Sequence, residues 1–176
     1  MRWNVTLALA STLALLAGPA RADKAAGAFT FDLSGGPGVA WTDRRGSTGG
    51  GPALNALGVA AGWYLTPRIT LTLRATHLFL ADGRHTAFHG LTAQWYAGRV
   101  LFGFGPGYMT LGGAAAFAAQ APDASDRGGF GVLARAGVVA FDGPRHAVNV
   151  VCEIAPGFLK DTNVLVASIA IEWQFR

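Results

Sequence analysis

The chain has 176 residues, of which 14 are Lys or Arg and 10 are Asp or Glu, so its net charge is only +4. The basic residues are scattered, and no basic run is interleaved with aromatic residues, which argues against a nucleic-acid-binding protein. The single cysteine, Cys152, excludes an internal disulfide. We interpret it as an unreactive apolar side chain that is buried or faces lipid on one face of a strand.

The first 22 residues have the layout of a secretory signal peptide. Arg2 precedes an apolar run over residues 5–17, and Ala20-Arg21-Ala22 forms an A-x-A cleavage site. The apolar run is too short for a transmembrane helix. We therefore expect cleavage after Ala22, which leaves residues 23–176 as one exported domain.

After residue 22, apolar and polar residues alternate in runs that are separated by turns or glycine-rich loops. None of these runs has a convincing helical period, whereas an alternation with period two is typical of β-strands. The expected strands cover residues 28–41, 53–65, 69–80, 86–96, 100–111, 129–141, 146–159 and 163–175. The sequence therefore predicts an all-β chain of eight strands.

The expected connections alternate in length along the chain. Short turns follow the second, fourth and sixth strands, whereas residues 42–52 and 112–128 form long loops after the first and fifth. The connections after the third and seventh strands are intermediate. An even strand number, with short turns at one rim and longer loops at the other, is typical of bacterial transmembrane barrels. With the N-terminus on the periplasmic side, the longer loops would face outward from the cell.

Charged residues are scarce within the strands, and most of them lie on the face opposite the bulky aliphatic side chains. This face carries Asp32, Arg74, Arg135, Glu153 and Glu172. In an eight-stranded membrane barrel it would line a lumen that is just wide enough to be filled by side chains. Because unpaired buried ions are costly, we expect these five residues to form a paired charge network. A soluble lipocalin-like barrel that binds a small apolar ligand would instead turn its charges outward. That fold and a narrow pore are the alternatives.

Aromatic residues recur at the ends of the even strands, on the short-turn rim. We expect six of them to form a girdle at the membrane surface: Trp63, Tyr64, Trp95, Tyr96, Trp173 and Phe175. Glycine and proline interrupt three odd strands at residues 35–38, 105–107 and 155–157. We interpret these interruptions as β-bulges near the long-loop rim, with a ligand approaching the backbone as the alternative.

The sequence contains no evident arrangement of catalytic or metal-binding residues. No cluster of cysteines or carboxylates accompanies the four histidines, so no metal site is predicted. Ser168 lies well inside a late strand on the same face as Glu172, but that strand has no histidine to activate a serine nucleophile. We therefore predict a protein that is not an enzyme and has no cofactor.

Four stretches carry a resemblance to a known family. They are Tyr64-Leu-Thr-Pro-Arg68, Leu101-Phe-Gly-Phe-Gly-Pro-Gly-Tyr108, Gly129-Phe-Gly-Val-Leu-Ala-Arg-Ala-Gly137 and the closing strand over residues 163–175. Together they resemble small outer-membrane barrels of the OmpA/OmpX-like type, including the porin-like barrels of Gram-negative bacteria. Arg176 departs from the terminal aromatic residue of that family.

The resemblance implies a fold, a location and a set of partners. The fold would be an eight-stranded antiparallel up-and-down transmembrane barrel, located in the outer membrane and exported through a cleaved signal peptide. The partners would be the lipid bilayer, lipopolysaccharide and the barrel-assembly machinery that inserts such proteins. The role would be structural or one of surface interaction, and the chain would be a monomer.

Overall fold

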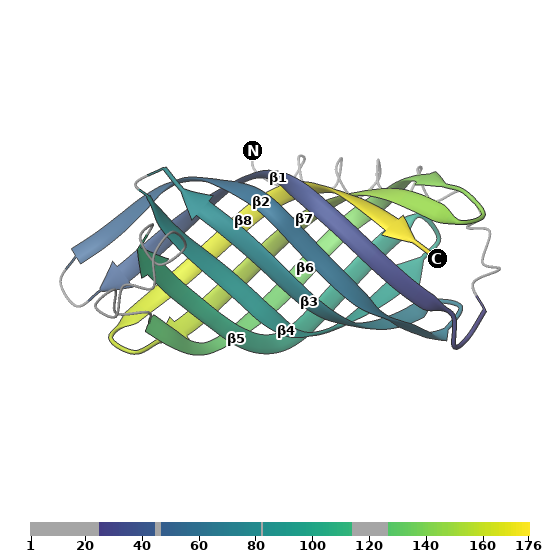
Figure 1. Ribbon diagram of the computed structural model, residues 1–176, viewed down its shortest axis with the longest axis horizontal. Helices are drawn as coiled ribbons and strands as arrows, with labels where there is room; N and C mark the ends of the chain where they lie inside the picture. Colours follow the sequence, from purple (N-terminus) through teal and green to yellow (C-terminus); the bar gives the residue numbers. More distant parts are fainter. Residues whose placement is uncertain (1–24, 45–46, 82, 114–126) are drawn as a thin grey trace, which may run out of the picture.

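The computed structural model describes residues 25–44, 47–81, 83–113 and 127–176. Each strand pairs antiparallel with its neighbours in sequence, and β8 returns to β1, so the sheet closes into a barrel (Figure 1). The strands are β1 Phe29–Arg44, β2 Ser47–Thr66, β3 Ile69–Leu80, β4 Arg84–Ala97, β5 Val100–Gly113, β6 Arg127–Asp142, β7 His146–Leu159 and β8 Thr162–Phe175. The predicted fold class and strand number are confirmed. In this part of the chain, no helix has the length and apolarity needed to cross a membrane. The predicted signal peptide lies outside the described residues.

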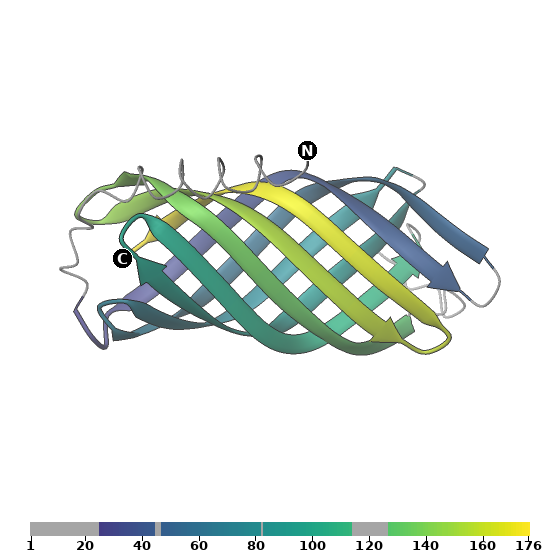
Figure 2. The ribbon, with the colours of Figure 1, turned by 180° about the vertical axis from the view of Figure 1, so that it is seen from behind.

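The pairing is staggered around the barrel. When the paired residues are followed from Leu33 of β1 across β2, β3 and each further strand in turn, the path reaches Asn163 of β8. Asn163 pairs with Asp43 of β1, which lies ten residues after Leu33. Strand number and stagger together determine the tilt of the strands and the width of a closed barrel. Figures 1 and 2 show the slanted strands on opposite sides of the barrel.

The connections between the strands lie alternately at the two ends of the barrel. We call the end that holds the connections after β2, β4 and β6 the turn rim, and the opposite end the loop rim. At the loop rim, β1 and β2 extend through most of the predicted loop 42–52, and Arg44 pairs with Ser47. The prediction of a long loop there is wrong. The hydrogen bonds between two strands are formed by backbone N–H and C=O groups, so residues of any type except proline can extend a strand when a partner strand lies beside it. Most of the predicted loop 112–128 lies outside the described residues.

The proline-containing interruptions are mostly not bulges. Near Gly35 the register does shift, but the extra residue, Ala56, lies on the facing strand β2. Through Pro106 and Pro156 the register is unbroken, so the bulges predicted there are wrong. Each of these two prolines has a register partner on only one neighbouring strand. A proline lacks the N–H that the other ladder would need, and a local gap in that ladder accommodates it without an inserted residue.

Candidate functional site in the barrel lumen

Side chains alternate between the lumen and the outer face of the barrel, as the period of a strand requires. On the outer face, large aliphatic side chains are exposed, with Leu73 at 68% and Ile171 at 63%. On the inner face, charged and polar side chains are buried. This distribution is the reverse of that in a soluble protein, where charged side chains are almost never buried and the surface is largely polar.

The five charged residues predicted for the lumen lie together inside it, and none is more than 3% exposed. Glu172 on β8 is the centre of the group. Its Oε2 atom lies 2.8 Å from Nη2 of Arg74 on β3 and 2.6 Å from Nη2 of Arg135 on β6. One carboxylate therefore joins two guanidinium groups that come from opposite parts of the barrel wall.

The other two carboxylates occupy the flanks of this centre. Nη2 of Arg74 lies 3.2 Å from Oδ2 of Asp32, and Nη2 of Arg135 lies 3.2 Å from Oε1 of Glu153. Glu153 also lies 3.7 Å from Nη1 of Arg74. Each buried ion thus has an oppositely charged neighbour, which offsets part of the large cost of removing charges from water.

Two amide side chains complete this layer, and we did not predict them as members of the network. Gln94 accepts a hydrogen bond of 2.8 Å from Nη1 of Arg135, and Asn149 donates one of 2.9 Å to Oε1 of Glu172. The alternation in sequence assigns both residues to the polar face. It does not say which residues of that face meet at the same height, because this depends on the stagger of all the strands.

Apolar side chains, with buried polar ones such as Thr30, Gln174 and Thr86 among them, lie on both sides of the charge layer. Toward the turn rim they are Tyr64, Tyr96, Leu101, Val139, Ala147 and Val151. Toward the loop rim they are Ala40, Ala53, Leu78, Leu80, Phe88, Met109, Leu111, Leu133, Ala155, Leu159, Val164 and Val166. The ions are therefore held in a low-dielectric environment, where an ion pair is electrostatically stronger than at a surface.

Side chains leave little space in the lumen beside the charge layer. The cavity there has a volume of about 10 Å³ and is lined by Thr76, Thr86, Glu153 and Ser168 together with apolar side chains. That volume is close to the minimum of ~10–15 Å³ that one water molecule needs. Pockets for small ligands measure ~300–1,000 Å³, so this cavity cannot hold the apolar ligand of a lipocalin-like carrier.

The comparisons with known proteins agree with this architecture. A scan against protein-family models finds no match, and a search of curated proteins finds none either. Among solved structures, Neisserial surface protein A matches with a TM-score of 0.57 and 11% identity, over 85% of this chain and 98% of that one. The N-terminal β-barrel domain of Pseudomonas aeruginosa OprF matches with a TM-score of 0.50 and 11% identity, over 83% and 97%.

The chain has the fold of a small outer-membrane β-barrel. The predicted resemblance to this class is confirmed at the level of the fold. The site described above is thus the interior of a barrel of the outer-membrane type, and its charged layer crosses the lumen between two apolar layers.

The predicted aromatic girdle of this outer-membrane barrel fold needs one correction. Trp63 and Trp95 are exposed on the outer face, whereas Tyr64 and Tyr96 are buried in the lumen. Their rings lie 6.3 Å apart there, and the Tyr96 hydroxyl accepts a hydrogen bond of 2.9 Å from Nε2 of Gln174. Consecutive residues of a strand point to opposite faces, so the members of a Trp-Tyr pair cannot both belong to the girdle.

Exposed aromatic side chains occur near both rims of the outer-membrane barrel fold. At the turn rim, the rings of Trp95 and Phe102 stack at 6.1 Å and those of Trp173 and Phe175 at 6.0 Å. Near the loop rim, a second group was not predicted and comprises Trp41, Tyr108, Phe130 and Phe158. Aliphatic side chains cover the surface between the two groups. An apolar band between two aromatic girdles is typical of transmembrane barrels.

The histidines and the cysteine lie on the outer face. The rings of His77 and His89 lie 5.2 Å apart near the loop rim, and His146 stacks on Phe141 near the turn rim. Within the described ranges, no group of three or more His, Cys, Asp or Glu side chains is arranged to hold a metal ion. Cys152 is exposed.

Proposed function

We propose that the mature chain is an integral outer-membrane β-barrel with a closed lumen and a structural or surface-interaction role. The observation that carries this proposal is the reversed distribution of polarity. Glu172 is fully buried inside the barrel, while aliphatic residues such as Leu73 and Ile171 are more than half exposed on the outside. In water, such a continuous apolar exterior would far exceed the patches that soluble monomers expose, whereas in a bilayer it faces hydrocarbon.

The filled lumen favours a structural or surface role over transport. The cavity of about 10 Å³ cannot hold a carried ligand, and apolar layers lie on both sides of the charged layer. A narrow pore would need a continuous polar path, and a carrier would need an empty interior. The lumenal serine, Ser168, lies on the opposite face of the barrel wall from the described histidines, which supports a role that is not enzymatic.

The proposal includes export and assembly. Residues 1–22 would be removed as a signal peptide, and residues 23–176 would insert as one barrel domain through the barrel-assembly machinery. The chain would be a monomer in contact with the bilayer and with lipopolysaccharide. The turn rim would face the periplasm, because it holds the start of β1 and the end of β8.

Cell fractionation tests the location directly. We expect the chain to stay in the membrane fraction after carbonate extraction and to migrate differently in gel electrophoresis before and after boiling. Both results would follow from a lipid-exposed barrel whose backbone hydrogen bonds are all satisfied within the sheet. A freely soluble periplasmic chain would contradict the proposal.

Planar-bilayer recordings test whether the lumen is closed. We expect no steady conductance from the folded chain, with a water-filled porin in the same bilayer as the positive control. Stable, stepwise currents from the purified chain would identify a pore and overturn the closed-lumen part of the proposal.

A further inference from the structure

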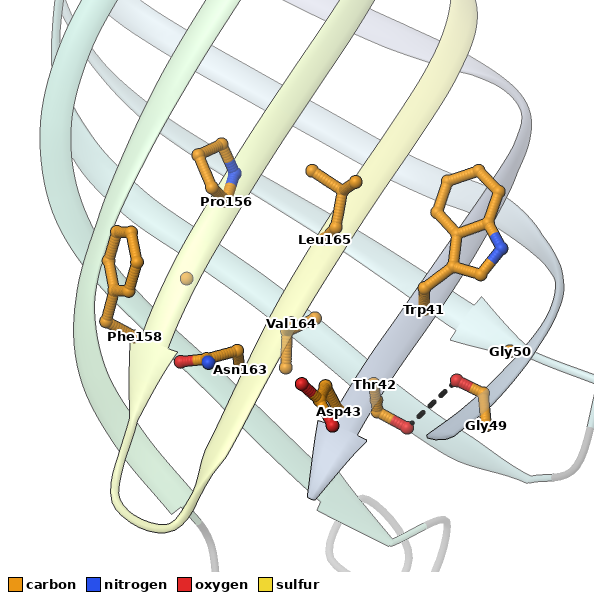
Figure 3. A pocket seen from close by; sticks show the side chains of 11 residues that line it. Trp41, Thr42, Asp43, Gly49, Gly50, Pro156, Phe158, Asn163, Val164 and Leu165 are labelled. Carbon is orange, nitrogen blue, oxygen red and sulfur yellow. Dashed lines mark hydrogen bonds between the residues drawn. The ribbon is translucent and has the colours of Figure 1, made fainter. Parts of the chain in front are cut away.

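The outer surfaces of the two rims differ in chemical character. At the loop rim, a pocket of about 520 Å³ forms a largely apolar groove, and Trp41 and Phe158 stand on its opposite sides (Figure 3). The turn rim instead carries cationic side chains. Arg68, Arg99 and Arg145 belong to the turns that connect β2 to β3, β4 to β5 and β6 to β7. All three arginines are exposed.

The three arginines occupy equivalent positions in the structure. Each is the last residue before an odd strand, and its backbone carbonyl accepts a hydrogen bond from an N–H group at or near the end of the next even strand. The donor and acceptor pairs are Tyr96 and Arg68 at 2.8 Å, Val139 and Arg99 at 2.7 Å, and Arg176 and Arg145 at 2.9 Å. These hydrogen bonds hold the three arginines at matching places, two strands apart around the barrel wall.

The guanidinium groups of these three arginines have no anionic partner within the described parts of the chain. None of the three side chains forms a hydrogen bond or an ion pair with another described residue. The one acidic residue in the described turns of this rim is Asp142, and its carboxylate pairs with Nη1 of Arg176. The three guanidinium groups are therefore available to anions from outside the chain.

Tryptophans of the outer face lie beside the arginines. Trp95 pairs with the residue that follows Arg68. The ring of Trp173 lies 5.7 Å from that of His146, which follows Arg145. Exposed tryptophans of a membrane protein lie at the boundary between hydrocarbon and head groups. Since a strand rises ~3.3 Å per residue and arginine side chains extend toward the polar surface, these arginines reach the level of the lipid phosphates.

We propose that the three arginines bind the head groups of anionic phospholipids of the phosphatidylglycerol type, one lipid at each turn. Each guanidinium donates to phosphate oxygens, and its planar fork can bond two of them at once. Two strand spacings of ~4.8 Å separate neighbouring turns around the wall, so each arginine meets a different lipid. A zwitterionic head group also carries a cation, and the described turns offer it no unpaired carboxylate. The inference names a lipid class for the proposed membrane partner, and it rests on the proposed membrane location.

Native mass spectrometry of the folded barrel in detergent micelles tests the proposal, with phosphatidylglycerol and phosphatidylcholine titrated separately. We expect one molecule of phosphatidylglycerol per turn to bind about fivefold more tightly than phosphatidylcholine. This factor corresponds to the attraction of one arginine to an anionic lipid surface. Equal affinities of the two lipids for the unaltered chain would overturn the proposal.

Substitutions in the three turns test which residues hold the lipids. The triple variant Arg68→Gln, Arg99→Gln, Arg145→Gln should lose the preference, and each single variant should lose one tightly bound lipid. The same three positions changed to lysine keep their charges and should retain the preference. Lys160→Gln removes an exposed cation from the β7–β8 turn at the loop rim and is the control. A preference that persists in the glutamine triple variant, or that Lys160→Gln lowers as much, would overturn the proposal.

An anionic polymer is the other candidate occupant, and its binding would also overturn the proposal. The probe is purified, insoluble peptidoglycan, sedimented together with the detergent-folded barrel. Sedimentation that the glutamine triple variant abolishes, and that phosphatidylglycerol does not compete, would assign the arginines to the polymer.

The failure of this inference is distinguishable from failure of the proposed function. A chain that folds into micelles without lipid preference contradicts only the three lipid sites. A chain that stays soluble without detergent contradicts the membrane location itself. The exposed arginines lie outside the buried lumen, so every variant should keep the gel migration shift of the folded barrel.

Discussion

Nη2 of Arg74 on β3 lies 2.8 Å from Oε2 of Glu172 on β8, although β1 and β2 separate the two strands in the barrel wall. The two strands come near each other only because β8 pairs with β1 and closes the sheet. In an open sheet, four strands would lie between them. The ion pair thus reports on the closed barrel.

The central position of Glu172 leads to a ranking of substitutions. We expect Glu172→Ala to lower the free energy of unfolding by about 3–5 kcal/mol, because it leaves two buried guanidinium groups without their shared carboxylate. Glu153→Ala should cost clearly less, since Glu153 has the longer contacts of 3.2 and 3.7 Å. Urea-induced unfolding of the barrel in lipid vesicles measures both losses. A larger loss for Glu153→Ala than for Glu172→Ala would contradict the geometry of the network.

A close approach of the backbone makes Gly62 on β2 intolerant of a side chain. A Cβ atom at this position would lie 1.9 Å from the carbonyl oxygen of Leu71. Gly62→Ala must therefore move the backbone, and we expect a loss of about 1–3 kcal/mol in the free energy of unfolding. Gly51→Ala on the same strand is the control, because a Cβ atom there meets nothing within 4 Å. Equal stability of the two variants would show that the strands do not approach so closely at Gly62.

Two described turns at opposite rims allow a test of orientation. Lys160 belongs to the turn between β7 and β8 at the loop rim, and Pro144 belongs to the turn between β6 and β7 at the turn rim. In a Cys152→Ser background, we expect a membrane-impermeant maleimide to label Lys160→Cys on intact cells but Pro144→Cys only after lysis. The reverse pattern would mean that the turn rim faces outward from the cell.

The position of Cys152 gives a test that needs no substitution. Its side chain is exposed on the outer face of β7, in the row that also contains Pro37 and Ile169. In the folded barrel in a bilayer, we expect a membrane-soluble maleimide to label it and a charged maleimide not to label it. Urea-unfolded protein should react with both reagents and is the control. Rapid labelling of the folded protein by the charged reagent would exclude a lipid-facing position.

Local alternation in the sequence determined much of this protein. Because successive side chains of a strand point to opposite faces, the sequence alone predicts that Asp32, Arg74, Arg135, Glu153 and Glu172 share one face. Turn residues and strand-like runs predict eight strands and the closed antiparallel order. The same rule assigns Trp63 and Tyr64 to opposite faces and therefore Tyr64 to the lumen. The prediction that both residues belong to the aromatic girdle did not follow this rule.

Only the tertiary structure decided which side chains meet. The contacts among Arg74, Arg135 and Glu172, the hydrogen bonds of Gln94, and the groove between Trp41 and Phe158 all join residues that are far apart in the sequence. The continuation of β1 and β2 through a glycine-rich segment has the same origin, because each strand is completed by hydrogen bonds to its partner. The physical reason is that stagger is a property of the closed barrel. It depends on all eight pairings at once, and no single segment of the sequence contains it.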